Sequence, residues 1–179
     1  YIIVEIIMQP MVANERRKGF IDNSLGSKLL EKPVLNYYDN DSIEIGPYKM
    51  LVNCYENCFF TYNITKAMLP QMITKNTILF FLLLTFAYYG IRNNIIAIPF
   101  LQLFLSSLFL IELIYHIVFF LKLKNLCDRF KHIFNVSKST KNKTIQDAVY
   151  MVLEYETTLA YNKSPNNNSI YQKLNQLLL

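Results

Sequence analysis

The chain has 179 residues, of which 53% are hydrophobic and only 17% are charged, and its formal net charge is +5. Soluble domains usually carry about 25% charged residues, so this composition excludes a disordered chain and a nucleic-acid-binding tail and disfavours an ordinary water-soluble enzyme. The chain starts at Tyr1 and ends in three leucines, so we expect it to be a fragment of a longer reading frame.

The first two predicted segments lie before the most apolar part of the chain. Residues 1–47 read as a cytoplasmic segment in which a truncated helix, interrupted at Pro10, is followed by a turn-rich stretch. Apolar residues then recur with helical spacing, which predicts an amphipathic helix over 48–71 that leads to the membrane. Pro70 marks an expected kink or break in that helix.

The chain contains three cysteines, Cys54, Cys58 and Cys127, which are the residues that a disulfide or a zinc site would use. An odd number with one C-x3-C spacing fits neither a disulfide framework nor a zinc ribbon. Cys54 and Cys58 fall on neighbouring turns of the expected helix. We interpret them as small apolar packing residues, with redox switching as the alternative. The sequence predicts no metal site and no cofactor.

Residues 72–121 carry the strongest signal, which predicts a transmembrane hairpin with spans at about 72–91 and 95–121. Sixteen consecutive residues of the first span are uncharged, and the second contains one formal charge, Glu112. As helices, the uncharged run at 76–91 and the second apolar run at 93–121 would reach roughly 24 Å and 43 Å. A bilayer core is about 30 Å thick. The predicted fold class is therefore an all-α integral membrane protein, with an antiparallel two-helix hairpin between cytoplasmic amphipathic helices.

Basic residues around the hairpin predict its orientation. Residues 122–179 form an expected basic juxtamembrane segment followed by truncated C-terminal cytoplasmic helices, one of them over 145–161. The positive-inside rule then places both flanks in the cytoplasm and the turn between the spans outside, with the basic segment in contact with anionic lipids rather than nucleic acid. The predicted interface anchors are Lys75, Arg92, Lys122, Lys124, Arg129 and Lys131.

Four polar residues of the second apolar run share one side of the predicted helix. At 100° per residue, Gln102, Ser106, Glu112 and His116 fall within an arc of about 120°. In a structural interpretation, Glu112 and His116 hydrogen-bond each other and the polar side of the first span. In a functional interpretation, the four residues line an oligomeric pore or the polar seam of a gate.

Several sequence stretches carry a family resemblance. They are ERRKGFIDNSLG at 15–26, YYDND at 37–41, NCYENCFFTYNITKAM at 53–68 and LEYETTLAYNK at 153–163. Together with the paired apolar runs, they resemble the C-terminal part of the bacterial SMODS-associated four-transmembrane pore-forming effectors, which are related to the SLATT group. The resemblance implies a further hairpin upstream, cytoplasmic helices, and a role in anti-phage defence with a nucleotide-signalling partner encoded nearby.

The sequence thus favours a pore-forming or membrane-disrupting effector that acts as a homo-oligomer in the inner membrane. It contains no Gly-rich phosphate loop, no residue set for a catalytic triad and no metal-ligand cluster, so we expect no enzyme activity. The alternative is a structural or accessory membrane protein whose hairpin anchors cytoplasmic helices to a partner complex.

Overall fold

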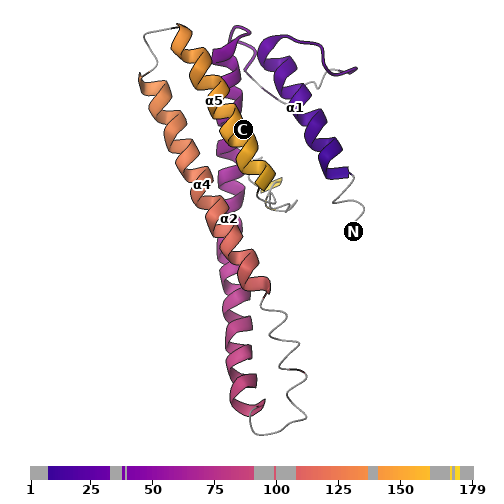
Figure 1. The fold of residues 1–179 in the computed structure, drawn as a ribbon, viewed down its shortest axis with the longest axis vertical. Coiled ribbons are helices and arrows are strands. Elements are labelled where there is room, and N and C mark those ends of the chain that lie inside the picture. The colour runs from indigo at the N-terminus through magenta and orange to yellow at the C-terminus, as the bar shows by residue number, and fades with distance from the viewer. Residues whose placement is uncertain are drawn as a thin grey trace. The chain divides into compact units, whose positions relative to one another are not determined.

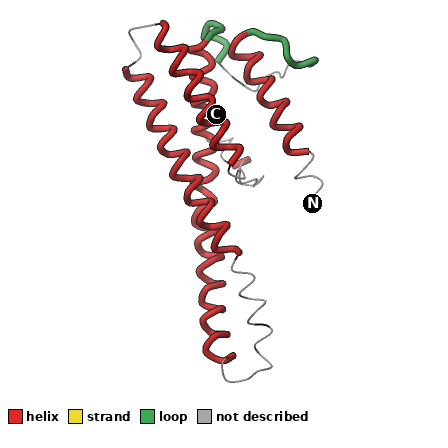
Figure 2. The backbone as a smooth tube through the Cα atoms, viewed as in Figure 1, coloured by secondary structure: helices red, strands yellow, loops and turns green. Residues whose placement is uncertain are grey.

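The structure, a computed structural model, describes residues 8–32, 38, 40–90, 99, 108–136, 141–161, 170 and 172–173. Its helices are α1 (Gln9–Leu25), α2 (Pro47–Gly90), α4 (Leu108–Val136) and α5 (Lys141–Tyr161), as Figure 1 shows. Among the described residues, only helices and connecting loops occur (Figure 2).

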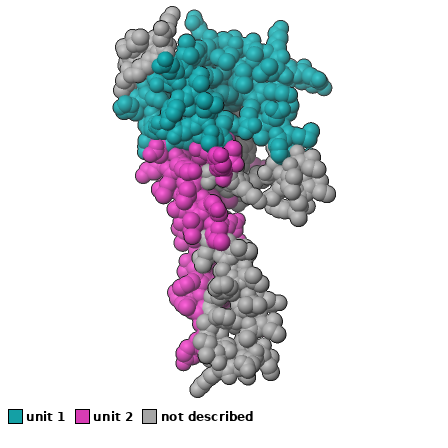
Figure 3. Space-filling model, viewed as in Figure 1, with its two compact units in different colours: residues 1–59, 126–157 teal, residues 60–125, 158–179 magenta. Residues whose placement is uncertain are grey.

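The chain divides into two compact units (Figure 3). Unit 1 contains Tyr1–Phe59 and Leu126–Thr157, and unit 2 contains Phe60–Asn125 and Thr158–Leu179. Helices α2 and α4 each contribute to both units.

The predicted transmembrane hairpin is wrong. In the described part of the chain, no helix is both long enough and apolar enough to cross a membrane. This finding contradicts the membrane part of the predicted fold class, the pore-forming character, and the multi-pass inner-membrane location with two cytoplasmic flanks.

Helix boundaries give the physical reason. Within the described residues, the uncharged part of α2 runs from Asn76 to Gly90, and the apolar part of α4 runs from Leu108 to Leu121. At about 1.5 Å per residue these stretches reach roughly 22 Å and 21 Å, short of a core about 30 Å thick. Residues 91, 95–98 and 100–107 of the predicted spans lie outside the described residues. Charged residues precede the uncharged stretch in α2 and follow the apolar stretch in α4, and α2 runs through Pro70 without ending.

Helix α1 begins where the sequence suggested an interruption. Pro10 lies in its first turn, where the missing N–H costs no helical hydrogen bond. The helix ends at Leu25, and Gly26 follows with a left-handed φ of 69° and donates its N–H to the carbonyl of Asp22. A β-carbon at Gly26 would lie 3.2 Å from the Ile45 side chain, so both conformation and space favour glycine here.

The carboxylate of Asp22 organises the chain that leaves α1. It accepts hydrogen bonds from the Ser27 hydroxyl at 2.6 Å and from the backbone N–H groups of Leu29 at 2.8 Å and Leu30 at 2.9 Å. The bond from Ser27 contributes most, and together these bonds lower the pKa of Asp22 below its ordinary value of 3.8.

The lowered pKa of Asp22 predicts an acid-sensitive contribution to stability. The folded state binds the proton more weakly than the unfolded chain, so the contribution is full above about pH 4 and disappears as pH falls through the folded pKa. We expect Asp22→Asn to flatten the fall of the melting temperature between about pH 5 and pH 2, as measured by circular dichroism. Glu31→Gln, at an exposed carboxylate, is the control. An unchanged pH profile in Asp22→Asn would contradict the prediction.

The core of unit 1 is built from all four helices. On each helix the buried residues recur with helical spacing and form the face that points into the core. They include Phe20 and Ser24 of α1, Leu51, Asn53, Cys54 and Cys58 of α2, Leu126, Cys127 and Phe130 of α4, and Ala148, Met151 and Tyr155 of α5.

Charged side chains connect α5 to α1 at the edge of this core. Arg16 Nη2 donates to both carboxylate oxygens of Glu156 at 2.6 Å and 2.9 Å, and Arg17 Nε donates to Oε2 at 2.7 Å. Burial is the largest single influence and lowers the pKa of the Arg16 guanidinium, but attraction to Glu156, Tyr155 and Tyr38 and the hydrogen bond to Glu156 together outweigh it, so the pKa is raised above its ordinary value. The paired charges fix the angular position of α5 relative to α1.

Unit 2 contains an antiparallel pair formed by the later part of α2 and the earlier part of α4. The rings of Tyr62 and Phe120 stack with centroids 5.4 Å apart. His116 Nε2 lies 3.0 Å from the carbonyl oxygen of Thr65, and both residues are buried. These two contacts set the register of the pair.

Candidate functional site

The predicted polar seam is only partly visible. Gln102 and Ser106 lie outside the described residues. Glu112 is exposed, whereas His116 is buried, and the hydrogen-bond partner of the imidazole is the backbone of Thr65 on α2. His116 therefore contacts α2 from α4. A helical wheel of α4 alone could not identify Thr65 as its partner, because Thr65 belongs to another helix.

The predicted basic anchors occupy different surroundings. Arg92 lies outside the described residues, and Lys75, Lys122, Lys124 and Lys131 are exposed. Their assignment as interface anchors stays a prediction.

Arg129, the remaining predicted anchor, forms hydrogen bonds to two residues of helix α5. Its Nη1 lies 2.7 Å from both carboxylate oxygens of Glu154, and its Nη2 donates to the Tyr150 hydroxyl at 2.7 Å. The guanidinium also lies 5.0 Å from the centroid of the Tyr150 ring. The hydrogen bond to Tyr150 is the largest cause of the raised pKa of Arg129. This residue joins α4 to α5 within unit 1.

Unit 2 carries an apolar outer face on α4, which we call the α4 stripe. Its residues recur at i, i+3, i+4, i+7 and i+10 and are 39–63% exposed. They are Ile111, Ile114, Tyr115, Val118 and Leu121. On the opposite side of the same helix, His116, Phe119 and Leu123 are buried. The stripe is therefore apolar surface that the α2–α4 pair does not use.

Charges around the α4 stripe are mostly basic. Exposed Lys122 and Lys124 lie on either side of its C-terminal end, while Glu112 falls on the α2-facing side by helical angle. The α2 and α4 parts of unit 2 that the structure describes add Lys66 and Lys75, giving four lysines against one acid. An apolar face with a basic rim favours an apolar ligand with an acidic edge.

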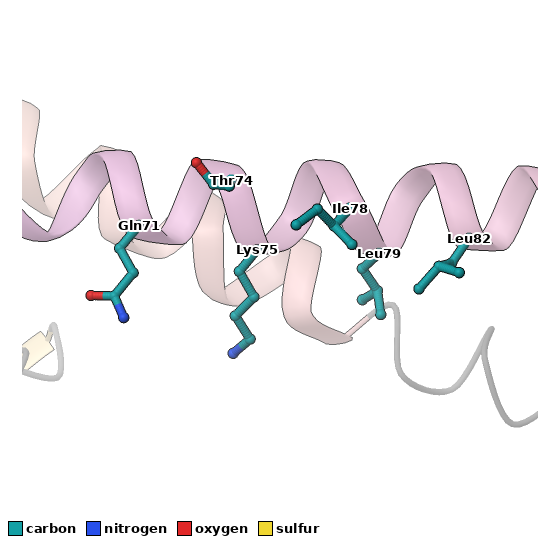
Figure 4. Close-up of a pocket in the computed structure, with 6 residues that line it drawn as sticks. All are labelled: Gln71, Thr74, Lys75, Ile78, Leu79 and Leu82. Carbon is teal, nitrogen blue, oxygen red and sulfur yellow. The ribbon is translucent and has the colours of Figure 1, made fainter.

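Helix α2 carries a shallow groove of about 590 Å³ in unit 2. Figure 4 shows its six lining side chains, all from one helix: Gln71, Thr74, Lys75, Ile78, Leu79 and Leu82. Small-molecule sites usually bring polar groups together from several elements around an enclosed volume. This groove lacks that convergence, so it is a poor candidate for an active site.

The described residues bring together no group of three or more His, Cys, Asp or Glu side chains able to hold a metal ion. They do bring Cys58 and Cys127 together, with 3.5 Å between the two sulfur atoms. Sequence spacing had grouped Cys58 with Cys54 instead, because contacts between distant helices leave no local pattern in a single sequence.

Comparison of the chain with known protein families, with characterised proteins and with solved structures gives no match.

Proposed function

We propose that this protein is a non-enzymatic interaction protein whose α4 stripe binds a helical segment of a protein partner. The observation that carries the proposal is the set of five exposed apolar residues at helical spacing on the face of α4 away from its buried side. Exposed apolar surface is unfavourable in water, and a contiguous patch of it typically marks an interaction site.

The chemistry of the stripe defines the partner. Anchors at i, i+3, i+4 and i+7 are the spacing with which one amphipathic helix packs against another. Tyr115 and the branched side chains of Ile111 and Ile114 supply the large apolar contacts that dominate such interfaces. We therefore expect an amphipathic helix with its own apolar stripe.

Charge favours a foreign acidic helix over a second copy of this chain. Two copies that met at the stripe as a parallel pair would bring together Lys122 and Lys124 from each, and in any pairing the two chains each carry a net charge of +5. Like charges at an interface oppose association, whereas acidic residues beside the partner's apolar face would pair with these lysines. The occupant that we propose is an amphipathic helix flanked by Glu or Asp.

A pair of synthetic peptides tests this assignment. Both are amphipathic helices with leucine at the four anchor positions, one flanked by glutamates and the other by lysines. Because of the basic rim, we expect the glutamate peptide to bind at least about tenfold more tightly at low ionic strength, with the difference shrinking as salt is added. Fluorescence anisotropy measures both dissociation constants.

A matched pair of variants locates the binding surface. Ile114→Glu introduces a carboxylate into the centre of the stripe, and we expect it to weaken binding of the glutamate peptide at least about tenfold. Leu153→Glu makes an equivalent change at an exposed aliphatic residue of α5 in unit 1 and should leave binding unchanged. Equal binding by wild type and Ile114→Glu would refute the assignment. Sedimentation showing a wild-type dimer that Ile114→Glu dissociates would identify a second copy as the occupant instead.

The place of such a protein in a bacterial conflict system rests on the sequence resemblance alone and stays a prediction. Its nucleotide-signalling partner would be encoded next to it. A cyclic-oligonucleotide synthase gene in the neighbourhood would support an effector role, and a transporter operon would support an accessory role in a partner complex.

A further inference from the structure

We propose that Cys58 of α2 and Cys127 of α4 form a reversible disulfide that joins the two helices within unit 1. Their sulfur atoms are 3.5 Å apart, although the residues are separated by 69 positions in the chain. Both are present as thiols. A disulfide bond is about 2.05 Å long, so the sulfurs must approach by roughly 1.5 Å, which a change in side-chain torsion and a small shift of either helix supply.

Neighbouring contacts hold the two cysteines in place. The Tyr55 ring lies 5.6 Å from that of Phe130 and 5.5 Å from that of Phe134, centroid to centroid. Tyr55 precedes Cys58 by three residues, and Phe130 follows Cys127 by three, so these ring contacts lie one turn from the thiols on each helix. The aromatic packing holds α2 against α4 one turn away from the two thiols.

Cys54 is also buried, one turn away from Cys58, but geometry excludes it as the disulfide partner. Residues four apart on a helix have their β-carbons about 5–6 Å apart. A disulfide requires about 3.5–4.5 Å between β-carbons, so joining Cys54 to Cys58 would break the helix. The cross-link that the fold supports is the one between helices.

The two thiols have different chemical roles. The hydrogen bond between the two thiols lowers the pKa of Cys127, and the same bond, followed by burial, raises the pKa of Cys58. Cys127 is therefore the thiolate that reacts first with an oxidant. Since both sulfurs are buried, hydrogen peroxide reaches them during local opening of the α2–α4 contact.

The reaction uses one molecule of hydrogen peroxide. The Cys127 thiolate attacks one peroxide oxygen, an S–O bond forms, the O–O bond breaks, and the hydroxide that leaves takes the proton of the Cys58 thiol to give water. The Cys58 thiolate then attacks the Cys127 sulfenic acid, an S–S bond forms, and the S–O bond breaks. This second hydroxide recovers the proton that Cys127 released on ionisation. Two thiols are thus oxidised to a disulfide and peroxide is reduced to two waters.

Oxidation of the purified full chain tests the proposal. After hydrogen peroxide treatment, we expect the titratable thiols under denaturing conditions to fall from three to one. Peptide mapping should recover a linked pair that contains Cys58 and Cys127. Closure of so long a loop should raise the melting temperature by roughly 10 °C, and dithiothreitol should reverse the change.

Three single variants separate this disulfide from its alternatives. Cys54→Ala should still form the linked peptide, while Cys58→Ala and Cys127→Ala should form none and show no rise in melting temperature. Circular dichroism of each reduced variant establishes that it is folded. The peptide map of the oxidised wild type identifies the linked pair even if a variant fails to fold. A Cys54-containing linkage, three reduced thiols after oxidation, or oxidation of Cys127 alone without a linked peptide would each overturn the proposal.

Discussion

Replacing Leu51 by alanine is expected to lower the free energy of unfolding by about 2–5 kcal/mol. Leu51 lies on the inward face of α2 and is fully buried in the core of unit 1. The substitution removes apolar contacts and leaves a cavity that close-packed neighbours fill only in part. Urea denaturation followed by circular dichroism measures the change.

Leu153 of α5 provides the matched control. It belongs to the same unit and also lies within a helix, but its side chain is 62% exposed. Leu153→Ala removes the same atoms with the same change in helix propensity, so we expect a change below about 0.5 kcal/mol. Similar losses in the two variants would show that α2 does not pack in unit 1 as described.

Replacing Asn53 by alanine is expected to cost about 3 kcal/mol. Asn53 is fully buried, and its Nδ2 donates to Asn23 Oδ1 at 2.8 Å and to Ser24 Oγ at 3.1 Å. Its Oδ1 accepts a hydrogen bond from Asn40 Nδ2 at 2.9 Å. The variant loses three hydrogen bonds at about 1 kcal/mol each, and it removes a partner from the Ser24 hydroxyl, which is buried away from water.

The Asn53 prediction is checked against an exposed asparagine. Asn125 lies on α4 and is exposed, so Asn125→Ala should change the free energy of unfolding by less than about 0.5 kcal/mol. Asn53 links α1 and the loop at Asn40 to α2, so its loss should also speed amide hydrogen exchange in α1. An equal effect of the two substitutions would contradict the role of Asn53 as a buried connector.

The failed membrane prediction has an identifiable cause. Apolar runs of the kind seen at 76–91 and 95–121 cannot be assigned to a lipid-facing or a protein-facing helix from periodicity alone. The decisive quantity is where each helix begins and ends; α4 is described from Leu108 onward, and most of the second apolar run before Leu108 lies outside the described residues. Helix boundaries depend on capping and on packing partners that a hydropathy window does not include.

For the site residues, too, the sequence shows the residue type but not the packing partner. The sequence singles out His116 and the cysteines as members of apolar helices, but it cannot name their partners. Thr65 for His116 and Cys127 for Cys58 lie tens of residues away, and only the antiparallel register of α2 against α4 brings them together. The α4 stripe was hidden for a similar reason, because an all-apolar stretch does not reveal which face is covered.

The sequence by itself determined that this chain builds helices, because apolar residues recur with a period near 3.6 and glycine and proline occur mainly between or at the ends of the periodic segments. Tertiary structure alone decided which face of each helix is covered and which thiols, carboxylates and guanidinium groups meet. The reason is that local preference acts along the chain, whereas burial, pairing and exposure arise from contacts between segments far apart in it.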